Sequence, residues 1–311
     1  MNNYHEPVLF DEVMSALNAQ PGGVYADGTL GGGGHSSGIL ARLGGTGCLY
    51  GIDKDTDAIE SAGERLGGAS NVELIHGDFH AMRELLEARG VTKLDGALLD
   101  LGVSSHQLDT PERGFSYHDD APLDMRMDAS RGETAADILA RMGDVELARI
   151  FRDYGEERWA ERIAKVITQR RARSPVLTTL DLVACVDAAI PKAVRMSGEG
   201  HPARRVFQAL RIAVNDELEP LEGALESIVG MLKPGGRLCV ITFHSLEDRI
   251  VKRTFARLRK PCTCPPSFPV CVCGKKPSAS GFGVKPISPS EDELIRNPRS
   301  RSAKLRVAER I

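Results

Sequence analysis

Short runs of apolar and β-branched residues recur along the chain, and stretches with helical spacing separate the early ones. The runs have the length of buried strands. Alternating strands and helices are typical of a parallel sheet that is covered on both faces. The pattern therefore predicts an α/β fold with a doubly wound sheet, in which ligands bind at the carboxyl ends of the strands. The five runs cover residues 24–29, 47–53, 72–79, 95–103 and 237–244.

The alternating pattern stops after the fourth run, and helical spacing takes over. Trp159, Ile163 and Ile167 share one helical face by their spacing. Strand-like residues return only after a long amphipathic stretch, in which Pro220 is expected to end one helix and begin the next. We therefore expect two domains: a discontinuous sheet domain at 1–104 and 206–311, and an inserted helical substrate-recognition domain at 105–205.

Two further features concern the end of the chain. The segment Lys233-Pro-Gly-Gly236 predicts a turn before the fifth strand, because proline and glycine are the residues that tight turns favour. Residues 304–310 alternate in the manner of a strand and are expected to close the sheet.

A cluster of glycines follows the first predicted strand, in the segment DGTLGGGGHSS that begins at Asp27. Each glycine costs about 0.5–1 kcal/mol of extra ordering, so four in succession suggest a ligand close to the backbone. A phosphate-binding P-loop would need a lysine that this segment lacks. The dinucleotide fingerprint G-x-G-x-x-G survives only in a degraded form, because Ser36 and Ser37 stand where its third glycine belongs.

Carboxylates mark the ends of four successive predicted strands: Asp27, Asp53, Asp78 and Asp100. With the glycine loop they resemble the S-adenosylmethionine site of class I methyltransferases, in which the carboxylate corresponding to Asp53 binds both ribose hydroxyls. A pyrophosphate prefers the positive end of a helix, whereas a sulfonium cation favours nearby carboxylates. A solvated loop acid would explain any one of the four, but a sulfonium ligand explains all of them.

Basic and acidic residues are concentrated in different stretches of the chain, although the net charge is only -3. A solvated helix face would explain any one basic cluster, but several clusters together favour a surface that binds a polyanion. Basic residues dominate 158–173, 249–260 and 296–306, while 109–128 is acidic.

The composition, with 41% hydrophobic and 27% charged residues, is that of a globular protein. No uncharged run reaches the roughly 18–20 residues of a membrane span, and no signal-peptide segment opens the chain. We therefore expect a cytoplasmic protein without a membrane partner. The oligomeric state stays open, with a homodimer among the alternatives.

Four of the seven cysteines form two close pairs, Cys262-x-Cys264 and Cys271-x-Cys273. The odd total argues against a secreted disulfide framework and for reduced thiols or a metal clip. Tetrahedral zinc would suit four thiols, but C-x-C spacing is less diagnostic than C-x-x-C. Zinc stays an open alternative here, and the predicted functional site contains no metal.

Six motifs, taken in their order along the chain, resemble the bacterial 16S ribosomal RNA cytosine-N4 methyltransferase family over nearly the whole sequence. The resemblance implies a class I methyltransferase with S-adenosylmethionine as cofactor. It implies methylation of the exocyclic N4 amine of a cytidine in the decoding region, with 16S rRNA or the small ribosomal subunit as partner. The motifs are DGTLGGGGHS from Asp27, LDLGVSSHQ from Leu99, ERGFS from Glu112, PLDMRMD from Pro122, HPARRVFQ from His201 and FHSLEDR from Phe243.

The resemblance also implies which residues contact the methyl donor. Reasoning from the residues agrees for the glycines, which admit a ligand to the backbone, and for the ribose-binding carboxylate. Phe79 would cover the adenine or else belong to the core, and His35 would contact the donor or merely begin a helix. Gln107 rests on the resemblance alone. The implied set is Gly33, Gly34, His35, Asp53, Phe79, Asp100 and Gln107.

Asp100 is also the predicted catalytic residue. The amine of cytosine is a poor nucleophile because its lone pair is delocalised into the ring. An acceptor for the amine hydrogens would orient the nitrogen and offset the positive charge that develops on it. Asp100 could equally serve only to bind the donor.

Other residues keep two interpretations. Phe243 and His244 would meet an extruded base or simply cap a strand end. Arg204, Arg205 and Arg211 would bind phosphates or form surface ion pairs, for instance with Glu217.

Three rival functions stand beside this interpretation. They are a nicotinamide-dependent oxidoreductase that uses Asp53 on a ribose, a non-catalytic ribosome-assembly factor and a DNA amino-methyltransferase. The last is disfavoured, since Leu101-Gly102-Val103 replaces the expected Pro-Pro-aromatic sequence.

Overall fold

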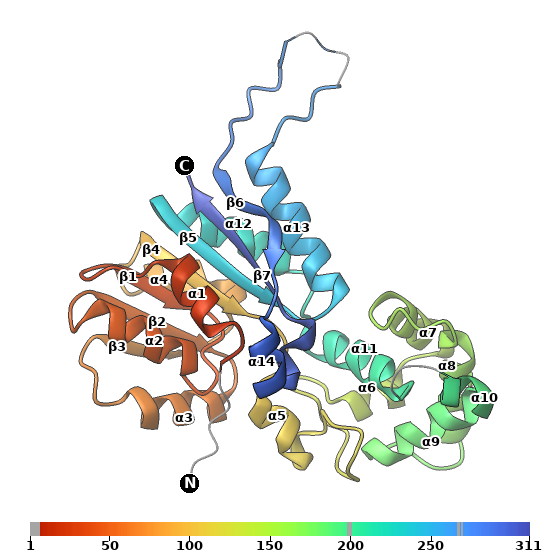
Figure 1. Cartoon of the computed structure of the whole chain (residues 1–311). Helices are drawn as coiled ribbons and strands as arrows, with labels where there is room; N and C mark the ends of the chain where they lie inside the picture. The colour runs from red at the N-terminus through yellow and green to blue at the C-terminus, as the bar shows by residue number, and fades with distance from the viewer. Residues whose placement is uncertain (1–6, 198–200, 266–267, 269) are drawn as a thin grey trace. The chain divides into compact units, whose positions relative to one another are not determined.

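The computed structural model describes residues 7–197, 201–265, 268 and 270–311 (Figure 1). The chain divides into two compact units: one runs up to Gly102 and resumes at Leu218, and the other is Val103–Glu217. The predicted domains differ from these units at residues 103–104 and 206–217, which belong to the second unit. Residues 1–6, 198–200, 266–267 and 269 of the predicted domains lie outside the described part.

The first unit is built on a seven-stranded sheet with the order β3-β2-β1-β4-β5-β7-β6. Strands β1 to β5 are parallel, whereas β7 is antiparallel to both β5 and β6. The strand order reverses between β1 and β4, which confirms the predicted doubly wound α/β class. The strands are β1 (Val24–Asp27), β2 (Cys48–Asp53), β3 (Val72–His76), β4 (Leu94–Asp100), β5 (Leu232–Thr242), β6 (Ala279–Ile287) and β7 (Lys304–Arg310).

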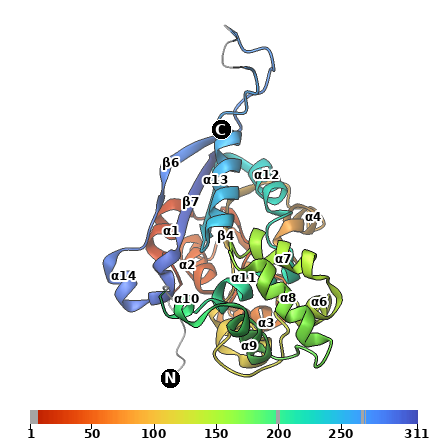
Figure 2. The ribbon, with the colours of Figure 1, turned by 90° about the vertical axis from the view of Figure 1, so that its right-hand side faces the viewer.

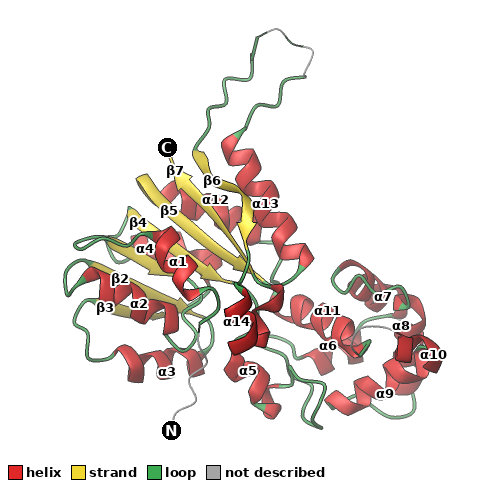
Figure 3. Ribbon diagram, viewed as in Figure 1, coloured by secondary structure: helices red, strands yellow, loops and turns green. Residues whose placement is uncertain are grey.

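Helices cover both faces of this sheet (Figures 2 and 3). Helices α1 (Phe10–Leu17) and α2 (Gly34–Leu43) share a buried cluster with Leu98 of β4 on one face. Helices α4 (Met82–Glu87), α12 (Leu221–Met231) and α13 (Ser245–Arg259) share another with Leu99 on the opposite face. Adjacent residues of β4 therefore enter different cores, which explains why the strand reads as an unbroken apolar run. Helices α3 (Thr56–Leu66) and α14 (Glu291–Arg296) complete the unit.

Two features of the last strands differ from the prediction. The predicted turn at 233–236 lies inside β5, where the pairing with β4 shifts register between Leu94 and Gly96 and Gly235 has a φ of +82°. Strand β6 was not predicted, because two glycines and a proline lower its strand propensity. Proline is compatible with an edge strand, and β6 lies at the edge of the sheet.

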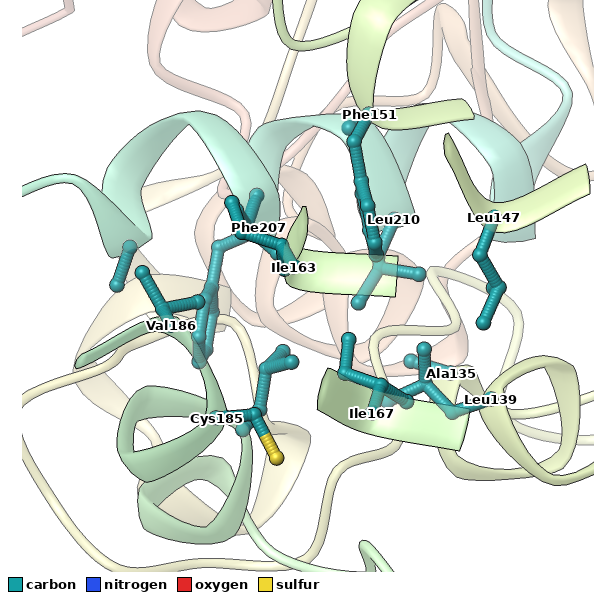
Figure 4. Packing of buried hydrophobic residues seen from close by; sticks show 14 of the residues in the cluster. Ala135, Leu139, Leu147, Phe151, Ile163, Ile167, Cys185, Val186, Phe207 and Leu210 are labelled. Atoms are coloured by element: carbon teal, nitrogen blue, oxygen red, sulfur yellow. The ribbon is translucent and has the colours of Figure 1, made fainter. Parts of the chain in front are cut away.

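The second unit is helical and has its own core, formed by residues such as Phe151, Ile163, Ile167, Phe207 and Leu210 (Figure 4). The predicted helical face of Ile163 and Ile167 is thus buried. Phe207 and Leu210 belong to α11, and their burial here explains why this helix falls in the helical unit. The helices are α5 (Ser105–Asp109), α6 (Ala135–Arg141), α7 (Asp144–Asp153), α8 (Ala160–Arg171), α9 (Thr179–Ala189), α10 (Lys192–Ser197) and α11 (Ala203–Asn215).

Within the described residues, every helix is too short or too polar to cross a lipid bilayer.

Candidate active site

The carboxyl ends of β1, β2 and β4 lie side by side, and each strand ends on an aspartate: Asp27, Asp53 and Asp100. The loop after β1 passes between the two neighbouring strands. Its Gly28 N–H donates to Leu98 O of β4 at 2.9 Å, and its Leu30 N–H donates to Ile52 O of β2 at 3.0 Å. These bonds hold the glycine loop at the point where the strand order reverses, which is where α/β sheets bind ligands.

Three glycines of this loop, Gly28, Gly33 and Gly34, have a structural reason in the fold itself. A Cβ on Gly28 would lie 2.5 Å from Leu99 Cδ2, and one on Gly34 would lie 2.5 Å from Pro7 Cγ. Gly33 is the residue before α2 and has a φ of +74°, a conformation that glycine adopts without strain. The proposed contacts of Gly33 and Gly34 with the methyl donor stay predictions, since folding alone accounts for these two glycines.

Asp53 connects the second strand to the glycine loop. Its Oδ2 accepts from Gly31 N at 2.8 Å, and its Oδ1 accepts from Asp55 N at 2.9 Å. Burial raises the pKa of this carboxyl to about 6. A carboxylate oxygen has two lone pairs, so each oxygen keeps the capacity to accept a hydroxyl. This arrangement suits the predicted ribose contact.

Asp27 is buried at the start of the loop, with 1% of its surface exposed, and is therefore not a solvated loop acid. Its Oδ2 accepts from Ser36 Oγ at 2.8 Å, and its Oδ1 accepts from Thr29 N at 3.2 Å. Burial raises its pKa to about 6, with a smaller contribution from the charge of Asp53. Asp27 thus ties β1 to the first turn of α2.

Asp100 has the least satisfied side chain of the strand-end aspartates. Its backbone N–H donates to Thr29 Oγ1 at 2.5 Å, but its buried Oδ1 has no hydrogen-bond partner within the described chain. Burial raises the pKa of this carboxyl to about 8, and the negative charges of Asp27 and Glu247 contribute to the increase. A buried acceptor without a partner is costly, so this oxygen suits a ligand that supplies a positive charge or a donor.

His35 lies beside Asp100 and is neutral. Its Nε2 is 3.0 Å from Val8 O, and because a carbonyl only accepts, Nε2 carries the ring proton. Burial lowers the pKa of His35 to about 4. The unprotonated Nδ1 faces Asp100 Oδ2 at 3.7 Å, so His35 brings no positive charge to the carboxyl. The ring also stacks on Phe10 at 6.1 Å, and its contact with the donor stays a prediction.

Glu247, on the first turn of α13, is a site residue that the sequence reasoning missed. It is 2% exposed, and its Oε2 accepts from the N–H groups of Phe243 and His244 at 3.0 and 3.3 Å. His244 precedes α13, and its Nδ1 accepts from Glu247 N at 3.4 Å. His244 therefore caps the helix that follows it and not, as one interpretation had it, a strand end, and its contact with an extruded base stays a prediction. The sequence did contain a signal for Glu247, because it lies three residues after the helix cap His244, which is the spacing of a capping box.

The remaining predicted site residues lie in different places. Phe79 begins the 3₁₀ turn after β3, and its Cβ would be 2.9 Å from a Cβ on Gly28, so it borders the glycine loop. Burial alone would raise the pKa of Asp78, but His80 and Lys54 hold it well below the usual range. Gln107 belongs to the helical unit, where its Oε1 accepts from Ser104 N at 3.0 Å. Its donor contact stays a prediction.

Several residues of the predicted basic clusters are engaged within the protein. Arg171 donates to Met142 O at 2.5 Å and also to Leu139 O, so it holds α8 to the end of α6. Arg211 pairs with Glu217 at 2.8 Å, as its second interpretation required. Arg158, Arg162 and Lys165 of the same basic stretch as Arg171 are not buried. Other internal pairs join Arg170 to Asp181, Arg257 to Glu222 and Glu226, and Lys304 and Arg306 to Asp248.

Comparison with known proteins gives a consistent answer along the whole chain. The profile of the MraW methylase family matches residues 2–311. A protein of Symbiobacterium thermophilum called ribosomal RNA small subunit methyltransferase H is 54% identical over 99% of this chain and 97% of its own length. Its namesake in Heliobacterium modesticaldum is 53% identical, covering 99% of each chain. In Agathobacter rectalis, ribosomal RNA small subunit methyltransferase H 2 is 52% identical, covering 98% of each.

Proposed function

Because this chain belongs to the MraW methylase family, with S-adenosylmethionine as methyl donor, we propose that it methylates the exocyclic N4 amine of a cytidine in the decoding region of 16S rRNA. The names of its relatives support small-subunit rRNA as the substrate. The six sequence motifs support the N4 amine and the decoding region. A cytoplasmic location belongs to the same proposal, since bacterial ribosomes are assembled there. A homodimer stays an untested alternative.

One observation carries the chemistry: the buried, unpartnered Oδ1 of Asp100, which lies in the negative field of Asp27 and Glu247. The sulfonium and ammonium groups of S-adenosylmethionine would place positive charge next to this carboxyl, which has only negative groups nearby. The glycine loop lies next to it, and Asp53 keeps lone pairs for ribose hydroxyls. The residues at these strand ends therefore fit the methyl donor.

Each residue then has a defined task. S-adenosylmethionine, when bound, supplies an electrophilic methyl group. Asp53 would bind the ribose of the donor, and Phe79 would cover its adenine. Gly33, Gly34 and His35 would contact the donor from the glycine loop. Asp100 in its ionised form would accept a hydrogen bond from the cytosine amine and orient the nitrogen.

Asp100 would also act on the charge that develops during transfer. A bond forms between the amine nitrogen and the methyl carbon while the carbon–sulfur bond breaks, which leaves the nitrogen cationic. A carboxylate stabilises this charge and can take the proton that the nitrogen loses. The pKa of Asp100 is about 8 in the ligand-free protein, and a cationic donor would lower it, so the carboxyl would be ionised and able to accept a proton in the complex.

We further propose that the helical unit recognises the RNA. The accessible side chains of Arg158, Arg162 and Lys165 would contact phosphates, which position a nucleic acid without reading its sequence. Arg170 and Arg171 have structural partners instead, so the RNA-binding role is assigned to fewer residues than the sequence suggested.

The test is direct methylation of small ribosomal subunits. Subunits from cells that lack this protein would be incubated with the pure enzyme and isotopically labelled S-adenosylmethionine, and the 16S rRNA would be digested and mapped by mass spectrometry. One label on a decoding-region cytidine, released as N4-methylcytidine on nucleoside analysis, is the expected result. Subunits from cells that contain the protein are the matched control and should accept little label. A label on a ring carbon or on another base would contradict the proposal.

A further inference from the structure

The described residues between α13 and β6, which are 260–265, 268 and 270–278, project beyond the ends of both elements (Figure 1). Its base is fixed, since Ser278 N donates to Leu258 O at 3.0 Å and Arg310 Nη1 donates to Ser278 O at 3.0 Å. Farther out, Val270 and Val272 are 70% and 73% exposed. Burial of these two side chains therefore contributes little to the order of the described part of the outer loop.

Four cysteine sulfurs meet in this outer part. Cys271 Sγ lies 3.5 Å from the Sγ atoms of Cys262 and Cys273, and 3.8 Å from that of Cys264. Cys262 and Cys273 are 3.8 Å apart, and all four sulfurs lie within 4.8 Å of one another. These separations exceed the roughly 2.05 Å of a disulfide, and all four residues are free cysteines. One C-x-C pair comes from each arm of the loop.

The spacing of the sulfurs matches one metal ion at their centre. Zinc–thiolate bonds are about 2.3 Å long, and in a tetrahedron this places neighbouring sulfurs about 3.8 Å apart. Four of the six separations are 3.5–3.8 Å, in agreement with that edge, and the other two are within 4.8 Å. An iron–sulfur cluster carries sulfides of its own and needs a wider cage than four sulfurs within 4.8 Å can give. The geometry therefore favours a mononuclear tetrahedral site.

The surroundings of the sulfurs suit thiolates. Val272 N donates to Cys264 Sγ at 3.3 Å. Four thiolates and one divalent cation carry a net charge of -2. Lys275 and Lys276 follow the last cysteine directly after Gly274, so positive side chains stand close in sequence to this negative centre.

We propose that Cys262, Cys264, Cys271 and Cys273 bind one structural Zn²⁺ that joins the two arms of the loop. Binding releases the thiol protons to solvent and forms four sulfur–zinc bonds, with no change in oxidation state. The ion would supply the ordering free energy that this coreless loop cannot obtain from burial. The cysteine spacing alone did not decide for zinc, whereas the convergence of the four sulfurs favours it.

The test uses the full-length protein purified under reducing conditions, with zinc and iron measured by mass spectrometry. One zinc per chain is expected. The double variant Cys262→Ser/Cys271→Ser, which removes one ligand from each arm, should contain less than a tenth of that amount. Cys48→Ser is the matched control, because Cys48 is a free cysteine in β2, and it should keep its zinc. Metal-free protein would be titrated anaerobically with Zn²⁺ and with Co²⁺, and one equivalent of either should bind, cobalt with tetrahedral thiolate absorption.

A second measurement separates loop order from global folding. Trypsin should cut the zinc-free protein and the double variant after Lys275 at least tenfold faster than the zinc-bound protein, whereas the bond after Lys276 precedes a proline and resists trypsin in every form. Thermal unfolding and binding of S-adenosylmethionine should be nearly unchanged, since the sheet core does not include this loop. The proposal would be overturned by reduced protein that binds no zinc on titration, by iron in place of zinc, or by disulfides that persist among these cysteines under reducing conditions.

Discussion

We expect donor binding to depend on pH because the Asp100 carboxyl ionises near neutral pH. Replacement of Asp100 by asparagine should abolish this dependence. The pKa of this carboxyl is raised to about 8, so the side chain is mostly protonated at neutral pH before ligand binds. A cationic ligand favours the ionised form and lowers this pKa. Binding therefore releases a proton, and affinity must rise as the pH rises toward 8.

The magnitude follows from the fraction of ionised carboxyl. With a pKa near 8, about 3% is ionised at pH 6.5 and about 90% at pH 9, a ratio of about thirty. The expected gain in affinity between these two pH values is therefore about thirtyfold, or about 2 kcal/mol. His35 contributes nothing here because its pKa is about 4. Asp27 and Asp53, with pKa values of about 6, titrate mainly below this range.

The assay is isothermal titration calorimetry of S-adenosylmethionine with the wild-type protein and with Asp100→Asn at pH 6.5, 7.5 and 9. The amino group of the ligand also titrates in this range, at a pKa of about 7.7–8.0, but it does so equally for both proteins. The ratio of the two affinities removes that contribution. Repeating the titration in buffers with different ionisation enthalpies counts the released proton directly.

A flat ratio of affinities between pH 6.5 and 9 would refute the reasoning, as would equal proton release by the wild-type protein and Asp100→Asn. S-adenosylhomocysteine, which lacks the sulfonium charge, gives a further check. Its binding should show a weaker dependence on Asp100 if the sulfonium is the charge that this carboxyl meets.

Four other outcomes are expected. Asp53→Ala should weaken donor binding about ten- to a hundredfold, because a hydrogen bond to a charged acceptor contributes about 1.5–3 kcal/mol; unchanged affinity in calorimetry would contradict the ribose assignment. At saturating donor, Asp100→Asn should slow single-turnover methylation about a hundredfold, or about 2.7 kcal/mol of barrier, whereas a full rate would make Asp100 a binding residue only. Arg162→Glu/Lys165→Glu should weaken RNA binding, with a smaller salt slope and unchanged donor affinity; equal loss of both would argue against a separate RNA surface. Arg171→Ala should lower the melting temperature in calorimetry, since two backbone carbonyls lose their donor, and an unchanged melting temperature would mean that these bonds contribute nothing net.

The central strands could be predicted because burial on both faces leaves a plain signal in the sequence. Leu98 and Leu99 enter opposite cores, so β4 reads as a continuous apolar run. Edge strand β6 has no such signal, because glycine and proline weaken its pattern. The residues at 233–236 predict a turn before β5, but they lie inside this strand, which accommodates them by a shift of its register with β4.

The site was predictable in part, for a related reason. Strand ends can be located from sequence, and parallel strands bring their carboxyl ends to one edge of the sheet, so Asp53 and Asp100 were expected at the same edge. The contribution of Glu247 depends on how β5 and β4 are paired, and its sequence signal was that of an ordinary helix cap. The partners of Arg170 and Arg171 are likewise set by tertiary packing, so their charge alone suggested a role in RNA binding.

The split of the sheet unit by the helical unit has a consequence during synthesis. Strand β4 is complete at Asp100, but its neighbour β5 begins only at Leu232, after the whole helical unit. At translation rates of about 5–20 residues per second, one edge of β4 waits on the order of ten seconds for its partner. Unpaired strand edges are sites of aggregation, and because translation sets this interval, rapid folding of the helical unit cannot shorten it. The nascent chain also lacks Glu247 throughout, and the full carboxylate cluster assembles only when β5 and α13 have been made.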